Sequence, residues 1–219
     1  YNIIAQKEFC KEYKREGINN IFLIPLIANV DNFKPLNLEK KYDVSFIGCQ
    51  KENRAENIRY LKDKGINVRV YGQFWDKCPD LKEIYYGVPD NKEMVRIINQ
   101  TKINLSFSEG KKGILHIKGR VPEVIACKSF LLTEYFSGYL DFFKQDEEIV
   151  MFENKDELVK KINYYLEHEL EREKIAEKAY NKLIRKYSTN KKFQEFVNKT
   201  VNDNSFTREL PIFKKKVYT

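Results

Sequence analysis

Residues 103–133 read INLSFSEGKKGILHIKGRVPEVIACKSFLLT and carry the clearest signals of secondary structure in the chain. Two continuous apolar runs, residues 103–107 and 130–133, are typical of strands that are buried on both faces. Between them, residues 120–128 have the apolar spacing of a short helix. Pro122 falls in the first turn of that helix, where a missing N–H is tolerated. A strand, a helix and a strand in succession predict part of a parallel sheet.

The same alternation continues on both sides of this stretch. Further strands are predicted at residues 44–47, 66–71, 84–86 and 148–152. Helices are predicted at residues 53–64, after the cap Asp90 with Glu93 at its third position, and at 156–170, 171–187 and onward to about 201. We therefore predict an α/β fold with a Rossmann-like, doubly wound parallel sheet, followed by C-terminal helices.

The first 40 residues have a different character. A short helix at 9–16 and a strand at 21–24 precede residues 25–35, PLIANVDNFKP, whose two prolines and Asn/Asp cluster mark a linker. We predict three parts. Residues 1–40 are the end of an N-terminal domain with an interdomain linker, residues 41–201 are the Rossmann-like domain, and residues 202–219 are a C-terminal tail.

Composition limits the class of protein. Of the 219 residues, 42% are hydrophobic and 33% are charged, as in ordinary globular proteins. The net charge is +8, but 40 basic residues alternate with 32 acidic ones, which indicates solvated helix faces. A basic nucleic-acid-binding domain is therefore the least favoured alternative, and no motif of such domains supports it. No apolar run approaches the length of a membrane span, about 18 residues. Three lysines, Lys214 to Lys216, would still allow contact with an anionic membrane surface.

The cysteines predict neither metal binding nor disulfides. Cys10, Cys49, Cys78 and Cys127 are far apart, and the two histidines are far from all of them. We expect reduced, mostly buried thiols, no metal site, no cofactor and a cytoplasmic location. No signal peptide is expected at the start of the chain.

Several segments, in order along residues 20–200, resemble a known family. They are the linker 25–35, YDVSFIG at 42–48, YGVP at 86–89, INLSFS at 103–108 and RVPEVIACKSFLLTE at 120–134. Together they resemble the donor-binding C-terminal half of GT-B glycosyltransferases of the glycosyl transferase group 1 type, in the subgroup similar to the spore maturation protein CgeB. This resemblance implies metal-independent transfer of a sugar from a nucleotide-sugar donor to a polysaccharide, lipid or protein acceptor. It also implies that the acceptor and the catalytic base belong to the N-terminal domain, so no catalytic residue is predicted and the fragment would turn over poorly alone.

Two departures from the family keep an alternative open. Lys128 occupies the place of a family glycine, so the turn there is expected to differ. The family's paired glutamates are closely spaced, whereas thirteen residues separate Glu109 from Glu123. Both departures give weight to a non-catalytic GT-B-like binding module that acts in the assembly of a surface layer or spore.

A donor pyrophosphate needs positive charge. The loop 110–120 carries Lys111, Lys112, Lys118 and Arg120, and it leads into the N-terminus of the helix 120–128. Arg54, near Gly48, is a second candidate, because a guanidinium binds phosphate through two N–H groups. Lys111 and Lys112 are interpreted as solvent-facing, whereas Arg120 is interpreted as functional.

The remaining predicted site residues are expected to bind the nucleoside. The resemblance implies that Glu123 binds the ribose hydroxyls, although an acidic residue in a first helical turn also complements the helix dipole. Gly87 and Val88 would let the base approach the backbone. His116 and the aromatic cluster of Tyr71, Phe74 and Trp75 are interpreted as incidental or as core residues. The predicted donor-binding set is Gly48, Arg54, Gly87, Val88, Ser108, Lys118, Arg120 and Glu123.

Overall fold

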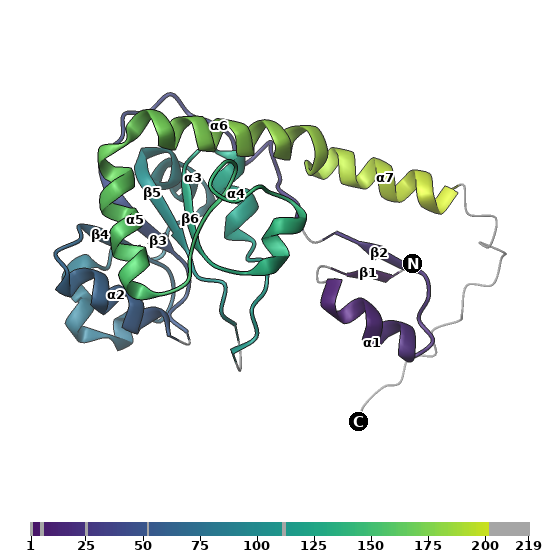
Figure 1. The fold of residues 1–219 in the computed structure, drawn as a ribbon, viewed down its shortest axis with the longest axis horizontal. Helices are drawn as coiled ribbons and strands as arrows, with labels where there is room; N and C mark the ends of the chain where they lie inside the picture. The colour runs from purple at the N-terminus through teal and green to yellow at the C-terminus, as the bar shows by residue number, and fades with distance from the viewer. Residues whose placement is uncertain (1, 5–6, 25, 52, 111–112, 202–219) are drawn as a thin grey trace.

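The computed structural model describes residues 2–4, 7–24, 26–51, 53–110 and 113–201. Its centre is a sheet of five parallel strands in the order β4-β3-β5-β6-β7 (Figure 1). The strands are β3 (Tyr42–Ile47), β4 (Val68–Tyr71), β5 (Thr101–Ser106), β6 (Leu131–Glu134) and β7 (Val150–Phe152). From β3 the chain adds β4 on one side and then β5 on the other, so the direction of winding reverses between β3 and β5. The predicted doubly wound parallel sheet is confirmed.

Helices cover both faces of this sheet. One face packs against α2 (Arg54–Asp63) and α5 (Lys155–Glu167), and the other packs against α3 (Asn91–Gln100) and α4 (Arg120–Ala126). Successive residues of a strand point to opposite faces, so Phe46 joins the first core cluster and Ile47 joins the second. The long helix α6 (Glu169–Lys186) contributes to both clusters.

Most predicted elements are present with small shifts of their ends. The predicted helix cap at Asp90 is confirmed, because its side chain accepts a hydrogen bond from the backbone N–H of Glu93 at 2.8 Å. The strand predicted at 84–86 is wrong. The 3-10 helix η3 (Pro79–Ile84) occupies its start, and Tyr85 forms only a single bridge with Val70. Too few extended residues remain before Gly87 for a strand to form.

The turn at Lys128 keeps the conformation that a glycine favours. Lys128 has φ of 52°, in the left-handed region. Its N–H donates to the Ile125 carbonyl at 2.9 Å, and the N–H of Ser129 donates to the Val124 carbonyl at 3.3 Å. These two bonds form a Schellman motif that ends α4. The expectation of a different turn at this position is therefore not supported.

The chain's N-terminal part forms a small unit of its own. A two-stranded parallel sheet joins β1 (Asn2–Ile4), which the sequence did not predict, to β2 (Ile21–Leu23), with α1 (Cys10–Arg15) between them. The last helix, α7 (Thr189–Val201), returns beside it (Figure 1). The rings of Phe22 and Phe196 meet edge to face at 5.2 Å. The division into domains at residue 40 stays a prediction, and the tail 202–219 with Lys214 to Lys216 lies outside the described residues.

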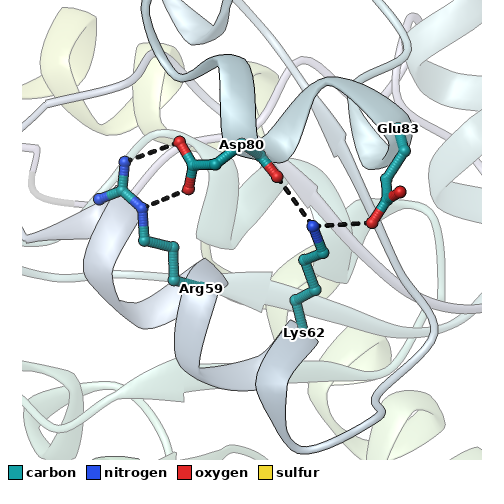
Figure 2. A network of polar contacts seen from close by, with 4 residues as sticks. All are labelled: Arg59, Lys62, Asp80 and Glu83. Carbon is teal, nitrogen blue, oxygen red and sulfur yellow. Dashed lines mark hydrogen bonds and ion pairs between the residues drawn. The ribbon is translucent and has the colours of Figure 1, made fainter.

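A polar network ties α2 to η3 (Figure 2). Arg59 donates two hydrogen bonds to the Asp80 carboxylate, at 2.6 and 3.2 Å, and this donation holds the pKa of Asp80 below its usual value. Lys62 donates to the Asp80 carbonyl at 2.8 Å and pairs with Glu83 at 2.7 Å. The network joins α2 to η3 at the surface.

No helix within the described ranges is both long and apolar enough to cross a membrane.

Candidate functional site

A small pocket lies where the winding reverses, at the carboxyl ends of β3 and β5. Ligands of open α/β sheets bind at such a switch point. The pocket has a volume of about 160 Å³. Four of its lining residues belong to the predicted donor-binding set, namely Gly48, Arg54, Lys118 and Arg120. Three cationic side chains from two separate segments of the chain therefore meet at one point.

Arg54 and Lys118 are held in place by backbone carbonyls. Arg54 is the first residue of α2, and its Nη1 donates to the Cys49 carbonyl at 2.8 Å. Its guanidinium lies 5.8 Å from the centre of the Phe46 ring. Lys118 Nζ donates to the Glu109 carbonyl at 2.8 Å. These contacts hold both cationic groups at the lining of the pocket.

Arg120 is more deeply placed and has a carboxylate partner. Its Nε donates to the Ile47 carbonyl at 3.2 Å, and its Nη1 lies 2.7 Å from Glu123 Oε2. Burial lowers the pKa of Arg120, and the charge of Glu123 opposes this effect. Burial likewise raises the pKa of Glu123, against the charge of Arg120. The predicted phosphate ligand and the predicted ribose ligand are thus partners of each other.

Gly48 and Gly72 follow the ends of β3 and β4, and their loops are hydrogen-bonded to neighbouring backbone, including Gly87. The N–H of Gly48 donates to the Tyr71 carbonyl, and the N–H of Gly72 donates to the Gly87 carbonyl, both at 2.9 Å. Trp75 donates its ring N–H to the Gly48 carbonyl at 2.8 Å. Gly87 has φ of 86°, and the neighbouring Val88 side chain is exposed. Gly87 and Val88 therefore lie at the same edge of the sheet but outside the lining of the small pocket.

Ser108 has a different environment from the other predicted residues. It is completely buried, and its hydroxyl donates to the Glu134 carbonyl at 2.8 Å. The Tyr139 hydroxyl lies 3.3 Å from it. These contacts indicate that Ser108 fixes the start of the loop after β5, and its role in donor binding stays a prediction.

Glu134, which sequence reasoning did not select, lies at the same edge of the sheet. Its Oε2 accepts a hydrogen bond from the N–H of Glu109 at 2.8 Å, at the carboxyl end of β6. The signal was its position directly after an apolar strand. His116, interpreted as incidental, lies with Nε2 3.0 Å from Lys118 Nζ. Lys111 and Lys112 lie outside the described residues.

The described residues contain no group of three His, Cys, Asp or Glu side chains that could hold a metal ion. All four cysteines are free thiols. Cys127 is buried, and burial raises the pKa of its thiol to about 12.

The sheet order, the covering helices and the pocket at the switch point define a Rossmann-like domain of the GT-B class. Similar solved structures include HepE of Anabaena in complex with UDP, with a TM-score of 0.70, 11% identity, and coverage of 91% of this chain and 63% of that chain. Sucrose-phosphate synthase of Thermosynechococcus elongatus has a TM-score of 0.69 and 12% identity, covering 91% of this chain and 57% of that one.

Residues 54–198 match the model of the glycosyl transferase-like family, so the chain belongs to that family. It is also 22% identical, over 192 residues, to the spore protein CgeB of Bacillus subtilis (strain 168). That match covers 78% of this chain and 59% of the relative, so the chain spans less than two thirds of the relative's length. The predicted resemblance to GT-B glycosyltransferases and to CgeB is confirmed.

Proposed function

We propose that this chain is the donor-binding half of a glycosyltransferase and that it binds the pyrophosphate of a nucleotide-sugar donor at the carboxyl ends of β3 and β5. The observation that carries this proposal is the convergence of Arg54, Lys118 and Arg120 on one pocket at the switch point. All three of these side chains are basic, and a pocket lined by basic side chains is suited to a diphosphate.

The same cations suit the chemistry of transfer. When the bond between the sugar and the diphosphate breaks, negative charge develops on the leaving oxygen. Positive groups fixed in advance stabilise this charge without reorganising during the reaction. We propose that the side chains supply this stabilisation without a metal ion. The acceptor would be a hydroxyl of a polysaccharide, lipid or protein, and no base for it is assigned.

The choice of nucleotide is guided by the comparisons. HepE is described in complexes with UDP and with UDP-glucose. Because it shares the fold, uridine diphosphate is the first nucleotide to test here. A cytoplasmic location, consistent with four free thiols, is part of the same proposal.

The non-catalytic alternative now has less support. One of its two arguments was an altered turn at Lys128, and that residue keeps the left-handed conformation. The wide spacing of Glu109 and Glu123 remains as its other argument.

Calorimetric titration with UDP, GDP, ADP, CMP and dTDP tests the proposal. We expect one nucleotide to bind, and Arg54→Ala to weaken its binding at least about tenfold, since a charge-assisted hydrogen bond contributes about 1.5–3 kcal/mol. Arg59→Ala is the matched control, because Arg59 lies on the same helix but contacts Asp80 instead of the pocket. The double variant Arg120→Met/Glu123→Gln removes both charges of the buried pair, so neither is left unpaired.

A melting experiment gives a second readout, because a ligand at 100 times its Kd stabilises the folded chain by about 2.7 kcal/mol. The proposal is wrong if no nucleotide binds, or if Arg59→Ala weakens binding as much as Arg54→Ala does.

A further inference from the structure

A larger pocket lies at the opposite end of the strands, where β5 and β6 begin. It has a volume of about 560 Å³, which is within the range of small-molecule sites. Its walls are the linker before β3, the ends of α3 and α4, and the first half of α6. The lining residues that matter most are Leu36, Lys40, Phe130, Glu169, Arg172 and Glu173.

Arg172 leaves one edge of its guanidinium unused. The residue is only 4% exposed, and its Nη1 donates to the carbonyls of Tyr165 and Leu166 where α5 ends. Its Nε and Nη2 donate to no described residue, and neither atom is enclosed, so both reach the solvent in the pocket. This edge is a planar fork of N–H groups that matches two oxygens of a carboxylate or a phosphate.

Lys40 places a second positive charge in the same pocket. Its Nζ donates to the Asn99 carbonyl at 2.8 Å and to the Thr101 carbonyl at 3.0 Å, where α3 ends and β5 begins. An ammonium group has three N–H donors, so one is left after these two bonds. Burial lowers the pKa of Lys40, and the nearby charge of Arg172 lowers it further. The two cations therefore lie close enough to repel each other, and an anion between them would relieve this repulsion.

Two carboxylates limit how much negative charge the pocket can take. Glu169 and Glu173 belong to its lining, and their charges raise the pKa of both Lys40 and Arg172. Both glutamates are exposed, and within the described part of the chain neither forms an ion pair with either cation. They would repel a ligand with several anionic groups, so a single oxyanion suits the pocket best.

The other lysines of the lining are less suited to hold a ligand. Lys102 pairs with Asp43 at 2.7 Å, and Lys128 pairs with Glu177 at 2.7 Å. Lys174 is exposed to solvent. The buried pair of Lys40 and Arg172 is therefore the centre of the pocket's positive charge.

Part of the lining is apolar. The side chain of Phe130 is 3% exposed, and Leu36, Leu38 and Ala176 also line the pocket. An anion with an apolar body would remove that body from water against these side chains. Inorganic phosphate has no such body and would use only the two cations.

We propose that Lys40 and Arg172 bind a small organic anion through its one carboxylate or phosphate group, with the apolar part of the ligand against Leu36 and Phe130. This site goes beyond the proposed function and does not depend on it, because it lies at the opposite end of the strands from the small pocket at the switch point.

A titration followed by the backbone amide signals in NMR spectra tests the proposal. The probes are phenyl phosphate and benzoate, which carry the two oxyanions on the same apolar ring, and benzamide, which is the neutral counterpart of benzoate. The amide signal of Phe130 reports on this pocket, and that of Gly48 reports on the small pocket at the switch point.

Two variants and two matched controls complete the experiment. Arg172→Lys keeps the charge but removes the fork, and Lys40→Met removes the second charge. Arg185→Lys is the control on the same helix, because Arg185 is exposed and donates to the Asn181 carbonyl. Lys41→Met is the control in the linker, because Lys41 is exposed and does not line the pocket. Melting temperatures check the folding of each variant, and either pocket variant suffices if the other does not fold.

We expect phenyl phosphate, benzoate or both to shift the Phe130 signal with a Kd of about 1 mM or lower, and benzamide to leave it in place. Arg172→Lys and Lys40→Met should each weaken this binding about tenfold or more, whereas both controls should bind as the wild type does. Binding of phenyl phosphate alone identifies a phosphate monoester site, and binding of benzoate alone identifies a carboxylate site. The inference is overturned if neither anion shifts Phe130, if the anions shift only Gly48, if benzamide binds as tightly as benzoate, or if the folded pocket variants bind as the wild type does.

Discussion

Arg120 and Glu123 form an ion pair 2.7 Å long across one turn of α4, with both side chains partly buried. The residues proposed to bind phosphate and ribose are therefore coupled before any ligand arrives. A diphosphate that binds Arg120 has to share its guanidinium with Glu123.

This coupling predicts different effects of Glu123→Gln on the affinities for two ligands. Inorganic pyrophosphate has no ribose, so we expect the variant to bind it several-fold more tightly, because Arg120 loses its competing carboxylate. UDP should gain less or lose affinity, because a ribose contact is weakened at the same time. Calorimetric Kd values for both ligands check this. Equal changes for pyrophosphate and UDP would show that Glu123 acts only through the charge of Arg120.

Gly72 is predicted to be irreplaceable for steric reasons. It has φ of 127°, and a Cβ at this position would lie 2.3 Å from the carbonyl oxygen of Gly48. We expect Gly72→Ala to destabilise the chain by more than about 2 kcal/mol, because backbone strain is added to a clash with backbone atoms. Denaturant unfolding measures this change.

Gly65→Ala is the matched control for Gly72→Ala. Gly65 also has positive φ, at 75°, but a Cβ there would meet nothing within 4 Å. It should cost only the strain of the left-handed conformation, about 1–2 kcal/mol. Equal losses for the two variants would contradict the clash at Gly48.

The fold was predictable because its signals are local. Apolar runs and caps near Asp90 and Gly65 mark elements by residues a few positions apart, and the order of these elements then limits the topology. The positions of Gly48 and Arg54 at this edge were predictable for the same reason, since Gly48 directly follows β3 and Arg54 begins the next helix.

The environment of single side chains was less predictable because it depends on distant contacts. Ser108 is buried by partners 26 and 31 residues further along the chain, Glu134 and Tyr139. A pocket between the first turns of α2 and α5 joins residues that are far apart in the sequence, so no local pattern marks it. The Arg120–Glu123 pair, by contrast, has the i,i+3 spacing of a helical ion pair and could have been read from the sequence.

The left-handed conformation of Lys128 predicts a stabilising substitution. Lys128 ends α4 in the left-handed conformation, which costs a residue with a Cβ about 1–2 kcal/mol of strain. Glycine avoids this strain, but it loses more backbone entropy on folding, which offsets part of the gain. Lys128 also pairs with Glu177 at 2.7 Å on the surface. Both Lys128→Gly and Lys128→Ala remove that ion pair. The difference between their stabilities therefore isolates the effect of the backbone conformation. We expect the glycine variant to be about 1 kcal/mol more stable than the alanine variant in denaturant unfolding. Similar stabilities would mean that the left-handed turn relaxes in solution.

Thiol reactivity offers an independent probe of the proposed donor site. Cys49 is partly exposed and directly follows Gly48, and its carbonyl binds Arg54. Cys127 is 2% exposed, and burial raises the pKa of its thiol to about 12, so almost none of it is the reactive thiolate at pH 8. With iodoacetamide at pH 8, peptide mass spectrometry should find Cys49 alkylated and Cys127 unmodified.

Saturating UDP should slow the reaction at Cys49, because a diphosphate on Arg54 covers the adjacent backbone. Cys10, partly exposed in the N-terminal part, should react at the same rate with and without UDP and serves as the internal control. Protection of Cys10 together with Cys49 would point to a general effect of UDP on the chain, and unchanged reactivity of Cys49 under saturating UDP would place the nucleotide elsewhere.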